Sequence, residues 1–521
     1  MTRRRHPSPA TAKLFLALSS AALLVVSFPR FNQLWCAWVA LIPWLALINR
    51  SSMRAAASWS YFIGLLFFIG SIRWLIHVTL PGWLLLCAYL AVFFALFGWI
   101  VHRIQRVRGE LLPPCLIAAA WVCLEYLRSH LLSGFGWNLL AYSQTSWPTL
   151  IQLADVTGCW GISFLIVFVN AALSTGAGLV RHAHRRRSAW PEGLVSLGAV
   201  VACLIVAVGY GRWRLQHLPA GPPLRIAIVQ GNIPQQQKWD PGRAESILQR
   251  YEQLTREAAR TQPQLIAWPE TSAPGSVGLD ESMTSRLVAL ARAVRIPLLI
   301  GTPLERSEGD QIRWTNSAVL MDARGTLVQR YDKLHLVPYG EFLPFERLAP
   351  WLRQWLPPMG DFVPGTEAIV FPVGGKPTFG VLICFEDVFP DLARRFVRHG
   401  ARLLINITND AWFGPTAAAY QHAQASTFRA VELRVPVIRA ANTGWSGCID
   451  ATGAWGRRVA DETGQELFTA GTVTCELAQG ATTSAYARWG DWFPGLCLVA
   501  VVNWLLAQRM LVRRRSILPI R

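Results

Sequence analysis

The apolar positions of this chain form long uninterrupted runs in its first 210 residues and again near its end, whereas residues 211–491 alternate apolar with polar positions. A run of about 17 to 25 apolar residues is long enough to span a bilayer as a helix. Such runs are found at 12–28, 31–48, 56–78, 82–101, 111–128, 161–180, 193–210 and 492–510. The pattern therefore predicts about seven transmembrane helices in residues 1–210 and one more in residues 492–521.

Clusters of arginine separate the predicted spans and fall on every second connection: Arg3–Arg5, Arg50 with Arg54, Arg103–Arg108, Arg181–Arg187 and Arg513–Arg515. Loops rich in Lys and Arg stay on the cytoplasmic side of a membrane, so these connections and the N-terminus are expected inside. Seven crossings then put residues 211–491 on the outer side. A cleaved signal peptide is the alternative for the first run, but that run leads almost directly into the second apolar run.

The region between the last two spans has the pattern of an α/β domain. Short apolar stretches predict strands at 224–230, 264–270, 297–301, 317–322, 378–384, 402–408 and 436–442. Helical patterns lie between them at 243–260, 281–294 and 417–432. Because strands alternate with helices, we expect layers of helix packed on sheet.

Composition supports a membrane protein and argues against a nucleic-acid partner. With 52% hydrophobic residues, 24 Trp and 24 Phe, the chain is too apolar for a soluble enzyme. Its net charge of +19 would also fit a nucleic-acid-binding protein. Such proteins gather Lys and Arg on one binding face, whereas here many of these residues lie in short clusters between apolar runs. We therefore interpret the clusters as topology signals.

None of the ten cysteines lies in a CxxC or zinc-binding spacing, so neither a disulfide framework nor a metal site is expected. Those in apolar runs are Cys36, Cys87, Cys115, Cys123, Cys203 and Cys497. Cys448 and Cys475 could pair in an oxidising compartment, but the sequence does not give their separation in space. This bridge is therefore not favoured from the sequence alone.

Two ionisable side chains stand where predicted strands end, Glu270 after LIAW and Cys384 after GVLI, and Lys333 follows the strand-like TLVQRY. Active sites of α/β sheets collect at strand ends, so residues distant in sequence can converge there. Taken singly, a loop glutamate or lysine is typically a solvated surface residue, and a cysteine ending a strand typically packs in a core. Together they supply a thiol nucleophile, a base for its proton and a cation for the oxyanion.

These three residues, in this chain order and within LIAWPET, RYDKLHLVPYGEFLP and GVLICFED, resemble the carbon–nitrogen hydrolase (nitrilase) superfamily over residues 224–477. With the apolar helices, QGNIPQQQKWDP (230–241), YGEFLP (339–344) and NITNDAWFG (406–414), the similarity narrows to the apolipoprotein N-acyltransferase family and spans the whole chain. The resemblance implies a multi-pass α-helical membrane domain plus an α/β nitrilase-like domain, an αββα sandwich, as the extracytoplasmic catalytic domain.

The resemblance also implies a role for each motif residue. Cys384 is the expected nucleophile, Glu270 the general base and Lys333 the cation that stabilises the oxyanion. Glu341 corresponds to a second glutamate of the family, which holds the lysine and closes the site. A carboxylate beside Lys333 would keep its ammonium charged and fixed despite burial, and a surface loop glutamate is the alternative for Glu341.

Five further residues belong to the same motifs. Glu386 matches the family glutamate two places after the cysteine and is expected to orient the site. Phe385 stands where a tyrosine often follows the nucleophile, so this chain keeps the aromatic surface and loses the hydroxyl. Trp239 is expected to line the acyl groove, with burial in the core as the alternative. Asn409 and Trp412 are expected to shape the substrate pocket.

Two predicted outer loops, 133–161 and 344–364, are unusually rich in apolar and aromatic residues. Their composition suggests contact with the membrane surface, and for the second a cap packed on the domain itself is the alternative. Glu125 and Arg128 are charged residues near the outer end of a predicted helix. Snorkelling to the surface is the ordinary explanation for such charges, and binding of a lipid headgroup is the alternative.

The resemblance implies ping-pong acyl transfer at the bacterial inner membrane, with the catalytic domain on the periplasmic side. A phospholipid donates an acyl chain to Cys384 as a thioester, and the N-terminal amine of a diacylglyceryl-cysteine apolipoprotein accepts it. No cofactor is implied, and a monomer is expected. Two alternatives remain open: a membrane-tethered amidase that passes the acyl group to water, and a receptor or scaffold without turnover.

Overall fold

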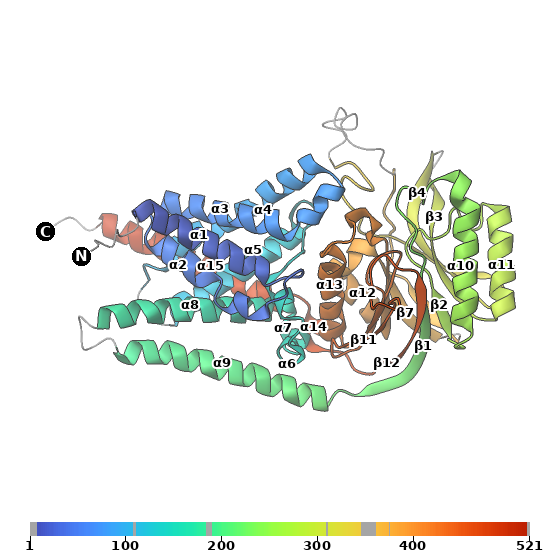
Figure 1. The fold of residues 1–521 in the computed structure, drawn as a ribbon. Coiled ribbons are helices and arrows are strands. Elements are labelled where there is room, and N and C mark those ends of the chain that lie inside the picture. The colour runs from blue at the N-terminus through green and yellow to red at the C-terminus, as the bar shows by residue number, and fades with distance from the viewer. Residues whose placement is uncertain are drawn as a thin grey trace. The chain divides into compact units, whose positions relative to one another are not determined.

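The computed structural model describes residues 8–107, 111–183, 190–308, 311–344, 361–374 and 376–517. The chain divides into two compact units, one of residues 1–216 with 489–521 and one of residues 217–488. The first unit is helical and the second is built around two sheets (Figure 1). The hydropathy pattern of the sequence predicts this change of architecture at residues 211 and 491.

The main helices of the first unit are α1 (Pro9–Val26), α2 (Leu41–Asn49), α3 (Met53–Ser71), α4 (Leu80–Ile104), α5 (Leu112–His130), α8 (Cys159–Ala183), α9 (Trp190–Gln216) and α15 (Trp492–Ile517). The shorter α6 (Pro148–Ile151) and α7 (Ala154–Thr157) precede α8. Within the described residues, five helices are long and apolar enough to cross a membrane. The number becomes six if 148–157 and 159–175, which are bent by 117°, count as one span.

The predicted span 31–48 is not one continuous helix. A short 3-10 helix, η1 (Leu34–Trp38), precedes α2, whose nine residues extend only about 13.5 Å against a hydrocarbon core of about 30 Å. Asn170 of α8 supplies hydrogen-bond partners to backbone groups on both sides of this break. Its Nδ2 donates to the Ala37 carbonyl and its Oδ1 accepts from the Leu41 N–H, both at 2.9 Å. Irregular backbone at membrane depth needs such protein partners, which a hydropathy pattern does not reveal.

Glu125 and Arg128 of α5 are buried rather than snorkelling, with 5% and 3% of their surface exposed. Glu125 Oε1 accepts the Leu140 N–H at 2.8 Å, and Arg128 Nη1 donates to the Trp137 carbonyl at 2.9 Å. Both bonds go to the loop 133–161. These charges therefore anchor that loop on the helix, because buried charged groups require hydrogen-bond partners.

The second unit contains two six-stranded sheets. The first has the order β12-β1-β2-β3-β4-β5, with β1 (Ala220–Gln230), β2 (Leu265–Ala267), β3 (Leu298–Glu308), β4 (Gln311–Met321), β5 (Leu327–Asp332) and β12 (Gly471–Gly480). The second has the order β11-β10-β9-β8-β7-β6, with β6 (Val370–Val373), β7 (Lys376–Ile383), β8 (Leu403–Thr408), β9 (Val437–Ala441), β10 (Gly447–Ile449) and β11 (Trp455–Arg458).

Parallel strands form the centre of each sheet and helices cover its outer face. β1, β2 and β3 are parallel in the first sheet, and β7, β8 and β9 are parallel in the second. The helices α10 (Ala244–Ala259) and α11 (Glu281–Val294) share one apolar core with the first sheet. The helices α12 (Pro390–Arg398) and α13 (Ala418–Leu433) pack on the second sheet (Figure 1), and α14 (Ala485–Trp489) follows β12. The αββα sandwich is thus confirmed.

The seven predicted strands and three predicted helices are all present, although their lengths differ. β2 is only three residues long because the chain turns at Pro269, and β3 continues to Glu308 in a long hairpin with β4. The strands that the analysis did not predict lie at the sheet edges or beside them, where polar residues weaken the alternation. Helix α12 was also missed, because its nine residues are too few for a helical period to stand out.

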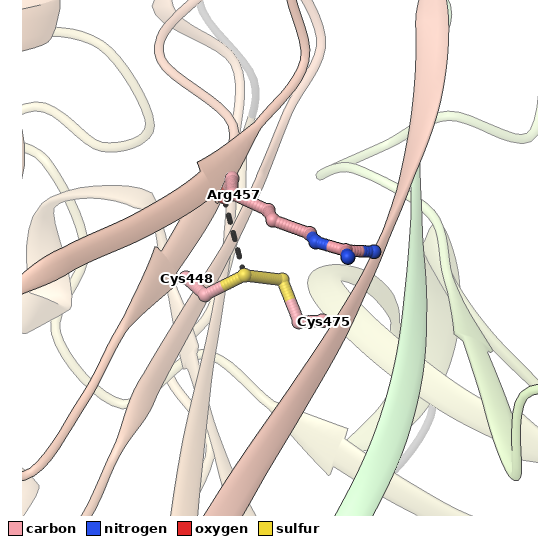
Figure 2. Close-up of a disulfide and its surroundings, with 3 residues drawn as sticks. All are labelled: Cys448, Arg457 and Cys475. Atoms are coloured by element: carbon pink, nitrogen blue, oxygen red, sulfur yellow. Dashed lines mark hydrogen bonds between the residues drawn. A yellow bond between two sulfur atoms is a disulfide. The ribbon is translucent and has the colours of Figure 1, made fainter.

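Cys448 of β10 and Cys475 of β12 form a disulfide that joins the second sheet to the first (Figure 2). Cys448 Sγ also lies 3.2 Å from the carbonyl oxygen of Arg457. The bridge corrects the sequence analysis, which did not favour it. The reason for the error is that strand pairing in two different sheets, and not spacing along the chain, brings these cysteines together.

The disulfide closes a stretch of 27 residues, so its removal should destabilise the second unit by about 3 to 4 kcal/mol. We expect the double variant Cys448→Ala/Cys475→Ala to unfold at a lower temperature than the wild type in detergent, measured by tryptophan fluorescence. Cys203→Ala, which removes an exposed free cysteine, is the matched control. Equal melting temperatures for the wild type and the double variant would show that the bridge does not support the fold.

Candidate active site

Glu270, Lys333 and Cys384, which the sequence analysis singled out, lie beyond the ends of β2, β5 and β7 and meet between the two sheets. Lys333 Nζ lies 3.6 Å from Glu270 Oε1 and 2.9 Å from Glu341 Oε1. Lys333, Glu270 and Cys384 are all buried. The structure therefore brings the predicted base, cation and thiol into one buried site, with Glu341 beside the cation.

Asn316 of β4 holds the two glutamates together, and the sequence analysis missed it. Its Nδ2 donates to Glu270 Oε1 and to Glu341 Oε1, at 2.8 Å each. Only 3% of Asn316 is exposed. A carboxylate that accepts bonds from a buried amide and lies beside an ammonium keeps one orientation. The available signal was an asparagine beside the predicted strand 317–322, which is weak by itself.

The charges of the site fix the protonation of its lysine and thiol. Burial would lower the pKa of Lys333, but Glu341 and Glu270 together outweigh burial and hold that pKa above its usual range. Burial and the Glu270 carboxylate raise the pKa of Cys384, against the opposing effect of Lys333. The resting site therefore holds an ammonium and a protonated thiol, so a base must take the thiol proton during attack.

Glu386 connects the turn at Cys384 to the loop that carries Lys333. Its carboxylate accepts the N–H groups of Ile383, Leu334 and His335 at 2.7, 2.7 and 3.0 Å. It also accepts the Tyr331 hydroxyl at 2.9 Å. Burial raises the pKa of Glu386 to about 7. This glutamate thus links the two sheets at the site, and its orienting role stays a prediction.

Cys384 itself has a backbone φ of 55°, in the left-handed region that a side chain other than glycine adopts at a cost. Asn406 Nδ2 donates to its carbonyl oxygen at 2.9 Å. Phe385, the next residue, is half-buried, and its ring packs edge-on against Phe389 at 5.1 Å. The turn after β7 is therefore held by bonds and packing on both sides of the thiol.

Lys238 is a second buried lysine, and sequence reasoning missed it although it lies inside the quoted motif 230–241. Its Nζ donates to the Glu270 carbonyl oxygen at 2.8 Å. Burial lowers the pKa of Lys238 to about 8. This bond holds the loop of Lys238 against the backbone of Glu270, the expected base. Lys238 also places a second amino group near the Cys384 thiol.

The three residues expected at the substrate pocket lie on two neighbouring loops. Asn409 is buried, and its Nδ2 donates to Gln235 Oε1 at 2.7 Å, which joins the loop 406–414 to the loop 230–241. Trp239 and Trp412 are 53% and 49% exposed, so Trp239 is not a core tryptophan. Their contact with a substrate stays a prediction. The apolar loop 344–364 lies mostly outside the described residues.

Known proteins that resemble this chain include two family models and several curated relatives. The model for the apolipoprotein N-acyltransferase N-terminal domain matches residues 20–172, and the model for carbon-nitrogen hydrolase matches residues 225–485. The apolipoprotein N-acyltransferase of Geobacter metallireducens is 37% identical over 514 residues, which cover 96% of each chain. That of Methylococcus capsulatus is 34% identical over 514 residues, which cover 95% of this chain and 96% of the relative.

Among solved structures, an amidase of the nitrilase superfamily from Nesterenkonia is 20% identical, covers 52% of this chain and 95% of its own, and has a TM-score of 0.36. The similarity predicted from the motifs is thus confirmed by the family models and the curated relatives.

Asn316→Ala removes the amide that bonds both Glu270 and Glu341. We expect the reaction of Cys384 with an activated acyl ester to slow by about 100-fold, comparable to the loss of one fixed donor at an active site. The rate is measured by mass spectrometry of the purified full chain. Gln253→Ala, on the exposed face of α10, is the control and should react at the wild-type rate. An unchanged rate in Asn316→Ala would remove Asn316 from the site.

Proposed function

Because this chain belongs to the apolipoprotein N-acyltransferase family, we propose that the site around Cys384 moves an acyl chain from a phospholipid to the N-terminal amine of an apolipoprotein. The observation that carries the proposal is the meeting of one thiol, one carboxylate and one ammonium at the ends of β7, β2 and β5. That set of groups performs covalent acyl transfer without a cofactor.

In the first half-reaction, Glu270 takes the proton of Cys384 as the sulfur attacks the ester carbonyl of the phospholipid. Lys333 stabilises the oxyanion of the tetrahedral intermediate, and Glu341 keeps its ammonium oriented at 2.9 Å. The carbon–oxygen bond to the glycerol then breaks, and Glu270 returns the proton to the leaving oxygen. A lysophospholipid leaves, and the acyl chain remains as a thioester on Cys384.

In the second half-reaction, the free amine of the diacylglyceryl-cysteine attacks the thioester carbonyl. Glu270 takes the amine proton, and Lys333 again stabilises the oxyanion. The carbon–sulfur bond breaks, the thiolate recovers a proton, and an amide is formed. The same base and the same cation serve both steps, because both steps pass through an oxyanion on one carbonyl oxygen.

The alternative in which water accepts the acyl group is less well supported. A tether needs one helix, whereas five helices in the described residues are long and apolar enough to cross a membrane. The curated relatives that match nearly the full chain are named as N-acyltransferases. An intact set of thiol, base and cation disfavours a receptor or scaffold without turnover.

We further propose that residues 217–488 lie on the periplasmic side of the bacterial inner membrane. The disulfide between Cys448 and Cys475 supports this side, because disulfides form and persist in oxidising compartments. The arginine clusters on alternate connections agree with it. The amine of an apolipoprotein becomes available on that side once its signal peptide has been removed.

Cys384→Ala should abolish the acyl adduct, because no other thiol lies beside Glu270 and Lys333 among the described residues. Mass spectrometry of the wild-type protein with phospholipid should find one acyl group on Cys384. Addition of a lipopeptide amine should discharge it quickly, and water alone only slowly. The control Cys203→Ala should keep the adduct. An adduct in Cys384→Ala would refute the proposed nucleophile, and rapid discharge to water would favour the amidase.

The proposed orientation is tested by labelling with a membrane-impermeant maleimide. A cysteine introduced at the exposed Gln236 should react in intact spheroplasts, whereas one at Ser188, between predicted spans on the cytoplasmic side, should react only after lysis. The unmodified protein gives the background from its native cysteines. The reverse pattern of labelling would put the thiol site in the cytoplasm and contradict the proposal.

A further inference from the structure

A buried cluster of four charged or titratable side chains lies behind Cys384, on the second sheet and its covering helix. It contains Asp387 of η7 (Cys384–Val388), Asp410 of η8 (Asp410–Phe413), His422 of α13 and Arg439 of β9. None of the four is more than 2% exposed. None of them belongs to the acyl-transfer steps described above, although the cluster touches the backbone of the nucleophile.

Both ring nitrogens of His422 face hydrogen-bond acceptors. Nε2 lies 2.8 Å from Asp387 Oδ1 and 3.2 Å from the carbonyl oxygen of Cys384. Nδ1 lies 3.0 Å from Asp410 Oδ1. A neutral imidazole donates from one nitrogen only and would turn the lone pair of the other toward a carboxylate. The contacts therefore require a proton on each nitrogen, which makes His422 an imidazolium cation.

The charges of the cluster balance only in that state. Arg439 Nη1 lies 2.6 Å from Asp387 Oδ2, and its Nη2 lies 3.6 Å from Asp410 Oδ2. Two carboxylates thus face one guanidinium and one imidazole. With a neutral imidazole, one negative charge would remain uncompensated in a buried region, which is strongly unfavourable.

We propose that His422, as a buried imidazolium, is a positioning residue for acyl transfer: it holds the backbone carbonyl of Cys384 and neutralises the Asp410 carboxylate behind the thiol. This inference rests on the proposed function of Cys384 as the nucleophile. It assigns His422 a role through Cys384 and no contact with the substrate.

The backbone of Cys384 makes such support necessary. Its φ of 55° is strained for a residue with a side chain, and such a conformation persists only where surrounding contacts hold it. Asn406 and His422 both lie within hydrogen-bond distance of the Cys384 carbonyl oxygen, at 2.9 and 3.2 Å. Loss of the ring would remove one of these two contacts and weaken the hold on the thiol between the base and the cation. Loss of one ring proton would turn a lone pair toward Asp410 or Asp387 and so disturb the contacts behind the thiol.

The charge of His422 also affects how readily the thiol ionises. Burial and Glu270 raise the pKa of Cys384 most, and Asp410 raises it further. An imidazolium 3.0 Å from Asp410 offsets that carboxylate. When His422 is neutral, the effect of Asp410 on the thiol is no longer offset, so removal of the thiol proton becomes more costly.

The pH at which this changes follows from the groups around the ring. Burial and Arg439 lower the pKa of His422, while Asp387 and Asp410 raise it and prevail, which brings it to about 9. Asp387, Asp410 and Arg439, from η7, η8 and β9, are charged groups that face the imidazole. Because this pKa lies above the ordinary value, the imidazolium is present at neutral pH and is lost as the pH rises through about 9.

The first test compares His422→Gln with the wild type from pH 6.5 to 10. Glutamine can donate from its single amide nitrogen and carries no charge. We expect acylation of Cys384 by phospholipid to be between about 10-fold and 100-fold slower in the variant at pH 7. The ratio of the wild-type rate to the variant rate should fall toward one above pH 9. At that pH His422 of the wild type loses the positive charge that the variant lacks. Lys238 is present in both proteins, so its own titration cancels in the ratio.

The control is His399→Gln, which changes an exposed histidine at the end of α12 and should match the wild type at every pH. Tryptophan fluorescence checks that each protein stays folded at the assay temperature and pH. A ratio that does not change with pH, or a variant that acylates at the wild-type rate at pH 7, would overturn the inference.

The second test observes the protonation state directly and does not require His422→Gln to be active. Nitrogen NMR of the full chain with ¹⁵N-labelled histidine should find one ring protonated on both nitrogens at pH 7.5, losing a proton near pH 9. Its signal should be absent from His422→Gln and shifted in Cys384→Ala. If the ring is neutral at pH 7.5 in both the wild type and Cys384→Ala, the inference fails, whether or not Cys384 is the nucleophile.

Discussion

The buried ammonium of Lys333 is the constraint on which the rest of the site depends. An ammonium with 1% of its side chain exposed is strongly destabilising unless carboxylates and hydrogen-bond acceptors surround it. Glu270 and Glu341 supply that surrounding charge, and Asn316 fixes both glutamates by its amide. These residues come from separate strand ends and loops. The buried ammonium of Lys333 is therefore also the reason why the strands and loops must keep their relative positions.

Polar groups at the site, and a disulfide elsewhere, fix the position of the two sheets of the sandwich relative to each other. Glu386 follows β7 of the second sheet, yet it accepts N–H groups from Leu334 and His335, which follow β5 of the first sheet. The disulfide between Cys448 and Cys475 joins the same two sheets through β10 and β12. A thiol on one sheet can meet a base and a cation from the other only if this spacing is preserved.

The convergence of Glu270, Lys333 and Cys384 could be predicted because strand-end position and motif chemistry agree at these residues. The groups that support this set were not predictable to the same degree. Asn316 is an ordinary residue within a buried strand, and nothing local indicates that its amide bonds two glutamates. Helix α13 was expected as a helix, but its period alone did not indicate that nearly all of its residues, polar ones included, are buried. Their burial is tolerated because charged partners, such as those of His422, come from other elements.

By itself, the sequence determined the properties that neighbouring residues decide: the apolar runs, the alternation of strands with helices, and the motifs that carry the expected nucleophile, base and cation. Hydropathy and periodicity depend only on neighbouring residues, so both can be evaluated without knowledge of the fold. Only the tertiary structure decided the helix break that Asn170 satisfies, the pairing of Cys448 with Cys475 and the charge cluster behind Cys384. Each of these depends on side chains that meet only after the elements pack, and no local pattern contains the distance between them.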